Sequence, residues 1–210
     1  MIRILIADDH PIVRAGLKQI VLEAADMVVA AEASDGHEVL AKVREADFDV
    51  VLLDLTIPGL SGLDVLKQVK SERPRLRVLI LSVHPEDQYA VRVLRAGAWG
   101  YVTKASAPEQ LIAAIRKVHQ GRRYVSPVLA ERLAEHLEPG AATMPHESLS
   151  DREYQVLCLL ASGKTATEIA DALALSVKTV STYRSRILEK MGMRTNAELT
   201  HYAIQNHLVD

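Results

Sequence analysis

VVLLDLTIPGLSGLDVL, residues 50–66, is the stretch that decides the predicted fold of the N-terminal half of this chain. The continuous apolar run before Asp54 is typical of a strand buried on both faces of a sheet. Pro58 and Gly59 then mark a turn, and a helical spacing of apolar residues begins at Gly62. A buried strand, an acidic residue at its end and a following helix form one repeat of a parallel α/β fold.

The same repeat recurs along the first half of the chain. Strands are predicted at 3–7, 27–33, 49–53, 77–82 and 100–104. Helices are predicted between and after them, at 11–24, 36–46, 62–73, 87–96 and 107–120. This alternation predicts an α/β fold over residues 1–121, with a doubly wound five-stranded parallel sheet and helices on both faces.

After Gly121 the strand pattern stops. Ser126 and Pro127 predict a short helix that runs to about residue 136, and EPGAATMPHES (138–148) has the composition of a linker. The remainder is helical, with helices predicted at 151–161, 165–173, 177–191 and 195–206. We therefore expect one domain at 1–121, a linker with a short helix at 122–147, and a separate all-α four-helix domain at 148–210.

The composition is that of a soluble globular protein, with 49% hydrophobic and 25% charged residues. Apolar runs are too short to span a membrane, and the N-terminus lacks the features of a signal peptide, so we expect a cytoplasmic protein with no membrane partner. Cys158, the only cysteine, excludes an internal disulfide and has the apolar setting of a structural residue. The formal net charge of −2 gives no support for DNA binding, which must be argued from local pattern.

Polar side chains lie at the carboxyl ends of four of the predicted strands. In chain order they are Asp8 and Asp9, Asp54, Ser82 and Lys104. Ligands of open α/β sheets bind beyond the carboxyl ends of the strands, so we expect these groups to converge on one rim. Helix capping explains Asp9 or Ser82 taken singly. Capping requires neither a lysine after the last strand nor two adjacent acids after the first, so the set indicates a functional site.

The charges of this set indicate its chemistry. Three carboxylates repel one another unless a hard cation lies among them, and Mg²⁺ suits oxygen ligands and a phosphate oxygen. One carboxylate can then attack a phosphoryl group, while Lys104 and the Ser82 hydroxyl hold the transferred oxygens. His10 is interpreted as a helix-start residue, because Mg²⁺ sites prefer oxygen, and Trp99 as a packing or partner-surface residue.

The C-terminal helices carry a helix-turn-helix pattern. Ser150 and Glu153 form a predicted capping box, and Ser176 caps VKTVSTYRSRILEKM (177–191), the candidate recognition helix. This helix has four basic residues and one acidic residue, a net charge of +3, which is typical of phosphate binding or of a solvated helix face. The apolar face of the final helix suits either a dimer contact or the core of the domain.

These motifs together resemble a known family. ADDHPIVRAGL (7–17), DLTIPGLSGL (54–63), LILS (79–82) and GYVTK (100–104) are similar to the flavodoxin-like receiver domain of two-component response regulators. Residues 148–210 resemble the LuxR-type DNA-binding domain of the NarL/FixJ class, most densely in SVKTVSTYRSRI (176–187). The resemblance implies a DNA-binding transcriptional regulator activated by phosphoryl transfer from a sensor histidine kinase to Asp54. The resemblance also implies that this regulator catalyses no reaction other than its own phosphorylation and dephosphorylation. Its implied partners are double-stranded DNA, a second copy in a homodimer and, as a further candidate, RNA polymerase.

The resemblance also assigns roles in the receiver half. The Mg²⁺ ligands are Asp8, Asp9, Asp54 and the backbone carbonyl of Thr56, and the phosphoryl contacts are Ser82 and Lys104. Tyr101 matches the aromatic switch position of the family. Thr56 and His84 flank the path of attacking water, which predicts that they set the lifetime of the phosphorylated form. Val83 stands where many receivers have alanine, and a β-branched residue there could crowd an inward-turning Tyr101.

In the recognition helix the resemblance divides the polar residues into two groups. Those expected nearest base edges are Ser181, Thr182 and Ser185, and those nearest phosphates are Lys178, Thr179 and Arg184. Short hydroxyl side chains read bases ambiguously, so no operator sequence follows.

Three alternatives belong to other classes of protein. A haloacid-dehalogenase-type phosphatase also uses an aspartate nucleophile after a strand, but it needs a second aspartate where this chain has Thr56. A small-molecule-sensing LuxR-type regulator would not need the acidic set at the strand ends. A phosphorylation-independent regulator with a receiver fold is opposed by the intact acidic set without being excluded by it.

Overall fold

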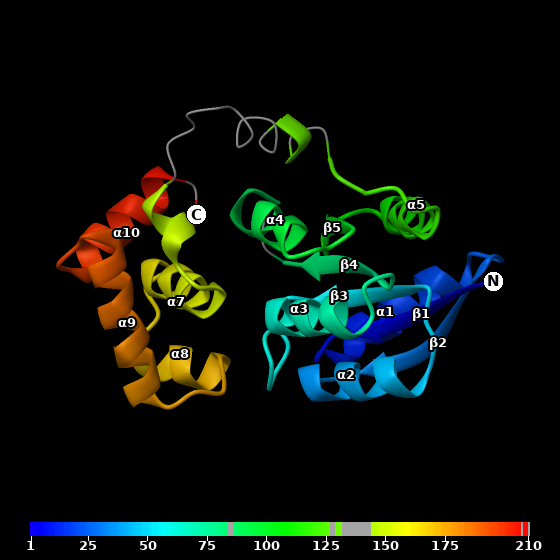
Figure 1. The fold of residues 1–210 in the computed structure, drawn as a ribbon, viewed down its shortest axis with the longest axis horizontal. Coiled ribbons are helices and arrows are strands. Elements are labelled where there is room, and N and C mark those ends of the chain that lie inside the picture. The colour runs from blue at the N-terminus through cyan, green and yellow to red at the C-terminus, as the bar shows by residue number, and fades with distance from the viewer. Residues whose placement is uncertain (84–85, 127–128, 132–143, 207, 210) are drawn as a thin grey trace. The chain divides into compact units, whose positions relative to one another are not determined.

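The chain folds into two compact units, Met1–Leu133 and Ala134–Asp210 (Figure 1). The computed structural model describes residues 1–83, 86–126, 129–131, 144–206 and 208–209. Among these residues, no helix combines the length and apolar character needed to cross a membrane. The predicted helix after Ser126 and the predicted linker fall largely outside the described residues, which include a helical stretch at 129–131 and a 3₁₀ helix, η1, at Pro145–Ser148.

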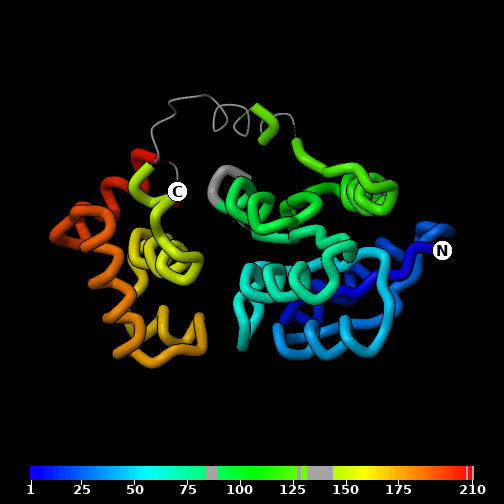
Figure 2. Tube along the Cα trace, viewed as in Figure 1, coloured from blue at the N-terminus to red at the C-terminus, as the bar shows by residue number. Residues whose placement is uncertain are grey.

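The first unit is built on a five-stranded sheet. Its strands are β1 (Ile2–Ala7), β2 (Met27–Ala33), β3 (Val50–Asp54), β4 (Arg77–Ser82) and β5 (Gly100–Thr103). They lie in the order β2-β1-β3-β4-β5, and every neighbouring pair is parallel. The predicted doubly wound parallel fold is therefore confirmed, and Figure 2 lets the alternation of strand and helix be followed along the chain.

Four helices connect the strands, a fifth follows the last strand, and the five cover the sheet. They are α1 (Pro11–Leu22), α2 (Gly36–Glu45), α3 (Gly62–Glu72), α4 (Glu86–Arg95) and α5 (Pro108–His119). Helices α1 and α5 pack together on one core cluster with alternate residues of the strands, among them Ile4, Ile6 and Leu52. Helices α2 and α3 contact each other. Because side chains of a strand alternate between faces, Leu5, Val51 and Tyr101 are buried outside that cluster.

The starts of these helices follow from local chemistry. Proline at the first turn begins α1 and α5, where its missing N–H is not needed. The side chain of Ser61 accepts a hydrogen bond from the Asp64 N–H at 3.1 Å and caps α3. Gly62 follows that cap with no room for a side chain, since an added Cβ would lie 2.3 Å from the carbonyl oxygen of Asp54. This close approach fixes the path of the chain directly after β3.

The second unit is helical. After η1 come α7 (Asp151–Ala161), α8 (Ala166–Ala172), α9 (Val177–Met191) and α10 (Asn196–Gln205). Ser150 and Glu153 form the predicted capping box, and Thr165 with Glu168 forms a second one. The inner face of α9 buries Val180, Ile187 and Met191 against the rest of the unit. The predicted all-α helix-turn-helix fold is confirmed.

The turn between α8 and α9 has an unusual backbone. Ala174 adopts a φ of 51°, and it is the one non-glycine residue with positive φ in the described part of the chain. A side chain in the left-handed region costs about 1 kcal/mol or more. The Leu175 N–H donates to the carbonyl of Ala170 at 2.8 Å across this turn. The helix-turn-helix geometry is therefore formed at a local conformational cost.

Candidate functional site

Polar side chains meet at the carboxyl ends of the strands, as the sequence predicts. Asp54 is the last residue of β3 and Ser82 the last of β4, while Asp8 and Lys104 directly follow β1 and β5. The Lys104 N–H donates to the Ser82 carbonyl at 2.7 Å, which ties the end of β5 to the end of β4. Parallel pairing of these strands brings the four residues to one rim.

Lys104 joins two of the carboxylates. Its Nζ lies 2.6 Å from Oδ2 of Asp8 and 2.7 Å from Oδ2 of Asp54. The exposed fractions of the two acidic side chains are 1% and 3%, and among the described lysines and arginines Lys104 is the one that forms an ion pair with them. Two carboxylates and a single cation in a buried setting leave an excess of negative charge.

The ionisation of the pair reflects this setting. Burial raises the pKa of Asp54 above its usual 3.8, and the charge of Asp8 adds to this, against the lowering by Lys104 and by the Thr56 N–H. Burial alone would lower the pKa of Lys104, but its contacts with Asp54 and Asp8 outweigh that effect and raise it. Lys104 is therefore held in its charged form beside a carboxylate that resists ionisation.

The acidic residues fit a divalent cation. Asp8, Asp9, His10 and Asp54 each offer a ligand atom, and these atoms lie within 4.8 Å of one another. Oδ1 of Asp9 is buried and accepts no well-aligned hydrogen bond in the described structure, although His10 Nδ1 lies 2.8 Å from it. Three carboxylates and one ammonium carry a formal excess of two negative charges, which one Mg²⁺ balances. The donor set of carboxylate oxygens is the one that Mg²⁺ prefers.

Asp9 does not occupy the N-cap position of α1, which is where the capping alternative would place it. The N-cap of α1 is His10, whose side chain makes no capping hydrogen bond, and the carboxylate of Asp8 accepts from the His10 N–H at 2.9 Å. His10 thus stands at the helix start, as predicted, and its side chain is 65% exposed. Asp54 accepts from the Thr56 N–H at 3.2 Å and begins no helix.

The side chains of Tyr101 and Val83, which were considered together at the predicted switch, have opposite environments. Tyr101 is fully buried, whereas Val83 is 68% exposed. The predicted crowding of an inward Tyr101 by Val83 is therefore wrong for this conformation, because the strand ends at Ser82 and turns Val83 toward solvent. Thr56 is exposed beside the acidic rim, and His84 lies outside the described residues.

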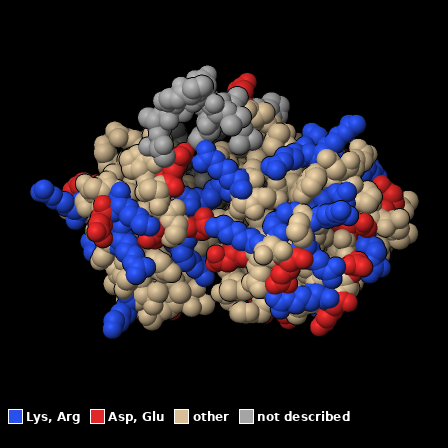
Figure 3. All heavy atoms as spheres, viewed as in Figure 1, with Lys and Arg blue, Asp and Glu red and all other residues tan. Residues whose placement is uncertain are grey.

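The outer face of α9 carries the residues expected to meet DNA. Lysine and arginine side chains gather over this helix in Figure 3. Three hydroxyls of the face donate to backbone carbonyls one turn earlier: Ser181 to Val177 at 3.0 Å, Thr182 to Lys178 at 3.0 Å and Ser185 to Ser181 at 3.1 Å. Each hydroxyl hydrogen is thus used within the helix, so the oxygens present lone pairs to a ligand.

Both halves match known families. The model of the response regulator receiver domain matches residues 4–116, and that of the luxR family of bacterial regulatory proteins matches residues 147–203. The chain is 37% identical over 209 residues to the response regulator UvrY of Escherichia coli K12, covering 99% of this chain and 96% of UvrY. This chain is a response regulator of the NarL/FixJ class. It is also 37% identical over 211 residues to the response regulator GacA of Pseudomonas aeruginosa PAO1, covering 100% and 99% of the two chains.

Solved structures agree with the assignment of this chain to the response regulators. RcsB of Salmonella enterica serovar Typhimurium, bound to the promoter rprA in the presence of phosphomimetic BeF3⁻, is 29% identical with a TM-score of 0.68, over 96% of this chain and 97% of RcsB. A LuxR-family response regulator from Aurantimonas sp. SI85-9A1 is 39% identical with a TM-score of 0.60, over 64% of this chain and 96% of that one. The response regulator is thus a DNA-binding protein of a two-component system, and the small-molecule-sensing alternative does not apply.

The structure of the response regulator also places residues that were assigned no role in DNA contact from the sequence. Nε of Arg184 donates to Oδ1 of Asn196, the first residue of α10, at 2.6 Å. Tyr183 and Arg186 line a hollow of about 320 Å³ on α9 together with four polar residues: Ser176, Lys178, Thr179 and Thr182. Helical spacing places Tyr183 and Arg186 beside Thr179 and Thr182, so the signal was present. Nothing in the sequence pointed to Asn196.

Proposed function

We propose that the response regulator accepts a phosphoryl group on Asp54 from a sensor histidine kinase and that this event controls DNA binding by its C-terminal unit. The observation that carries the proposal is the position of Lys104 between the buried carboxylates of Asp8 and Asp54, at 2.6 and 2.7 Å. A structural ion pair needs one acid, whereas this ammonium is placed against two acids at the rim where α/β sheets bind ligands.

The chemistry is that of a carboxylate nucleophile. The Asp54 carboxylate attacks phosphorus, the bond to the histidine nitrogen of the kinase breaks, and that nitrogen keeps the electron pair. Asp8, Asp9 and Asp54, with the backbone carbonyl of Thr56, would hold Mg²⁺. When bound, the ion neutralises the carboxylates and the incoming phosphoryl oxygens. Because Asp54 resists ionisation in its buried setting, neutralisation of the site keeps it in the nucleophilic form.

The neighbouring residues act on the product. Lys104 leaves its ion pair with Asp54 to hold a phosphoryl oxygen, and the Ser82 hydroxyl holds another. Tyr101, which is buried in β5 three residues before Lys104, passes the change to the surface of the receiver. Thr56 and His84 set the lifetime of the acyl phosphate by controlling the approach of water. In this account the response regulator catalyses only its own phosphorylation and dephosphorylation.

DNA binding is assigned to α9. Lys178, Thr179 and Arg184 bind phosphates, and Ser181, Thr182 and Ser185 face base edges in the major groove. The intrahelical hydrogen bonds of these three hydroxyls favour their use as acceptors. Amino groups of adenine and cytosine are the donors that the groove offers.

The assembly follows from the same reasoning. We infer a receiver domain at 1–121, a linker at 122–147 and a DNA-binding domain at 148–210, in a cytoplasmic protein. Phosphorylation shifts the population toward a homodimer whose two α9 helices read half-sites about one helical turn apart. RNA polymerase is a further partner of the dimer at its promoters.

A small phosphodonor tests the chemistry without the kinase. The full chain is incubated with the donor, with Mg²⁺ or with a chelator, and the modified residue is mapped by mass spectrometry. The proposal expects modification that requires Mg²⁺ and lies on Asp54, and none in Asp54→Asn. Modification at another residue, or equal modification with the chelator, contradicts it.

A further inference from the structure

A group of cations lies at the end of the receiver sheet opposite Asp54. Arg77 is the first residue of β4, Lys70 lies in the last turn of α3, and Arg123 follows α5. Nζ of Lys70 donates to the Leu76 carbonyl at 3.0 Å, and Nη1 of Arg123 lies 3.4 Å from the Leu94 carbonyl. In the described part of the chain, no carboxylate forms an ion pair with any of the three cations.

These cations act on one another. Burial lowers the pKa of the Lys70 ammonium, and the charges of Arg123 and Arg77 lower it further. Like charges gathered without a counter-ion repel, and the repulsion is stronger where the groups are partly withdrawn from water. The cluster of Lys70, Arg77 and Arg123 therefore carries repelling charges that no described carboxylate pairs with.

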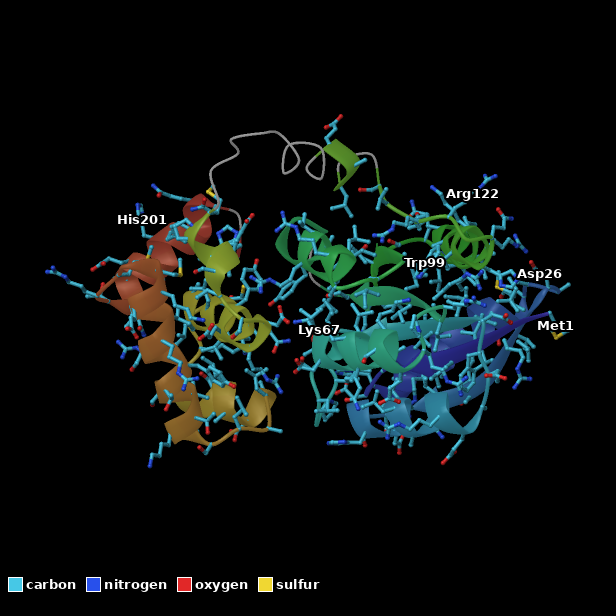
Figure 4. All side chains as sticks on the ribbon, viewed as in Figure 1. Met1, Asp26, Lys67, Trp99, Arg122 and His201 are labelled. Carbon is cyan, nitrogen blue, oxygen red and sulfur yellow. The ribbon has the colours of Figure 1, made fainter. Side chains whose placement is uncertain are left out.

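Arg77 has a buried donor without a described partner. Its Nε is buried and has no hydrogen-bond partner among the described residues. Its guanidinium carbon lies over the ring of Trp99, 5.8 Å from the ring centroid. Figure 4 labels Trp99 beside the start of β5. A buried donor on a charged group is costly to leave unpaired, so an acceptor at this position is favoured.

Arg77 also lines a cleft of about 520 Å³, whose walls include Phe48 and Leu76. The acidic residues of this cleft are already engaged: Glu72 with Arg44 at 2.6 Å, Asp47 with Arg73 at 3.1 Å, and Asp49 with the N–H of Arg3 at 2.8 Å. Arg75 and Arg77 keep their charges unpaired among the described residues that line the cleft. The cleft thus offers apolar walls beside the cation cluster.

We propose that Lys70, Arg77 and Arg123 bind a small oligophosphate anion, either inorganic or the phosphate chain of a nucleotide. Three cations call for a ligand with several negative charges, and guanidinium groups match phosphate oxygens in geometry. The site lies at the amino end of the strands and Asp54 at the carboxyl end, so the site is independent of the proposed phosphorylation. The adjoining apolar walls leave room for a nucleoside.

Trp99 gives a direct test because it is the only tryptophan in the chain and lies against Arg77. Tripolyphosphate is titrated into the full chain at constant ionic strength with a chelator present, and the emission of Trp99 is followed. We expect a saturable change. Lys70→Gln and Arg123→Gln should each weaken binding by about tenfold, as the loss of one charged hydrogen bond implies. Arg116→Gln is the matched control, because Arg116 already pairs with Asp26 at 2.8 Å. The affinity of this variant for tripolyphosphate should equal that of the wild type.

Further measurements distinguish an inorganic oligophosphate from a nucleotide and exclude a general effect of charge. A nucleoside triphosphate that binds more tightly than tripolyphosphate supports a nucleotide ligand, and equal affinities support an inorganic one. Arg123 is exposed, so Arg123→Gln should fold normally, and its circular dichroism spectrum checks this. An emission of Trp99 that does not respond to either anion overturns the proposal. So does a loss of affinity in Arg116→Gln as large as that in Arg123→Gln.

Discussion

Nζ of Lys104 lies 2.7 Å from Oδ2 of Asp54, in a setting where the acid is 3% exposed and the lysine 14%. The ammonium therefore stands close to the space that a divalent cation would share with the same carboxylates. Charge balance at the rim depends on Lys104 when no other cation is bound. This relationship makes Lys104 both a counter-ion of the resting site and a competitor of the metal.

Lys104→Met should tighten Mg²⁺ binding several-fold at alkaline pH, because a repelling positive charge is removed while Asp54 is ionised in both proteins. The substitution also removes a contact that lowers the pKa of Asp54, which burial already raises. As the pH falls, protonation of Asp54 should therefore weaken Mg²⁺ binding at a higher pH in the variant than in the wild type. Calorimetric titration with Mg²⁺ across pH measures both effects, and weaker binding in the variant at alkaline pH contradicts them.

Gly62→Ala should destabilise the receiver by about 1–3 kcal/mol through overpacking. An added Cβ would lie 2.3 Å from the carbonyl oxygen of Asp54 and 2.6 Å from Cα of Leu55, so the backbone under the acidic rim must move. Phosphorylation should slow as well. Gly16→Ala is the matched control, since nothing lies within 4 Å of its added Cβ and alanine favours the α1 helix. Urea denaturation gives the two free energies of unfolding, and equal effects at the two positions would refute the prediction.

Ala174→Gly should stabilise the C-terminal unit by about 0.5–1 kcal/mol, because glycine adopts the φ of 51° at this turn without a Cβ penalty. Ala172→Gly, two residues earlier in the last turn of α8, should have the opposite sign, since it adds backbone freedom within a helix. Thermal unfolding of the two variants distinguishes them. A loss of stability in Ala174→Gly would show that the turn carries no strain.

Asn196→Ala should lower the DNA affinity of α9 by about fivefold, or about 1 kcal/mol, because Asn196 acts only by orienting the Arg184 guanidinium. Its Oδ1 accepts from Nε of Arg184 at 2.6 Å, and without it the guanidinium loses its fixed orientation toward a phosphate. In an Arg184→Ala background the same substitution should change nothing further. Fluorescence anisotropy with a promoter fragment measures the DNA affinities of the wild type, the two single variants and the double variant. If the two substitutions have additive effects on affinity, Asn196 acts on stability alone.

The sequence predicted those parts of the molecule whose side-chain pattern repeats. Strands such as 49–53 are buried on both faces, so the apolar run is continuous and the carboxyl end falls at an acidic residue. The observed β3 lies one residue later, at Val50–Asp54, which places Asp54 in the strand itself. The rim of Asp8, Asp54 and Lys104 follows from parallel pairing and needed no tertiary detail.

Other features depend on contacts that no local pattern carries. The exposure of Val83 follows from where β4 ends, one residue before it. The pairing of Arg184 with Asn196 crosses the junction between α9 and α10 and depends on the angle between the two helices. Lys70 and Arg77 come together only when the end of α3 lies beside the start of β4, where Lys70 donates to the Leu76 carbonyl. Each of these is a property of the folded unit.

The most direct test of the central claim is the DNA affinity of the full chain with and without a small phosphodonor, at fixed salt and Mg²⁺, for wild type and Asp54→Asn. The account predicts that the donor tightens promoter binding by the wild type by tenfold or so and leaves Asp54→Asn unchanged. Arg116→Gln changes a surface residue that has no part in the acidic rim, so the donor should tighten its promoter binding as it does for the wild type. An equal response of wild type and Asp54→Asn, or none in either, would contradict phosphorylation of Asp54 as the switch.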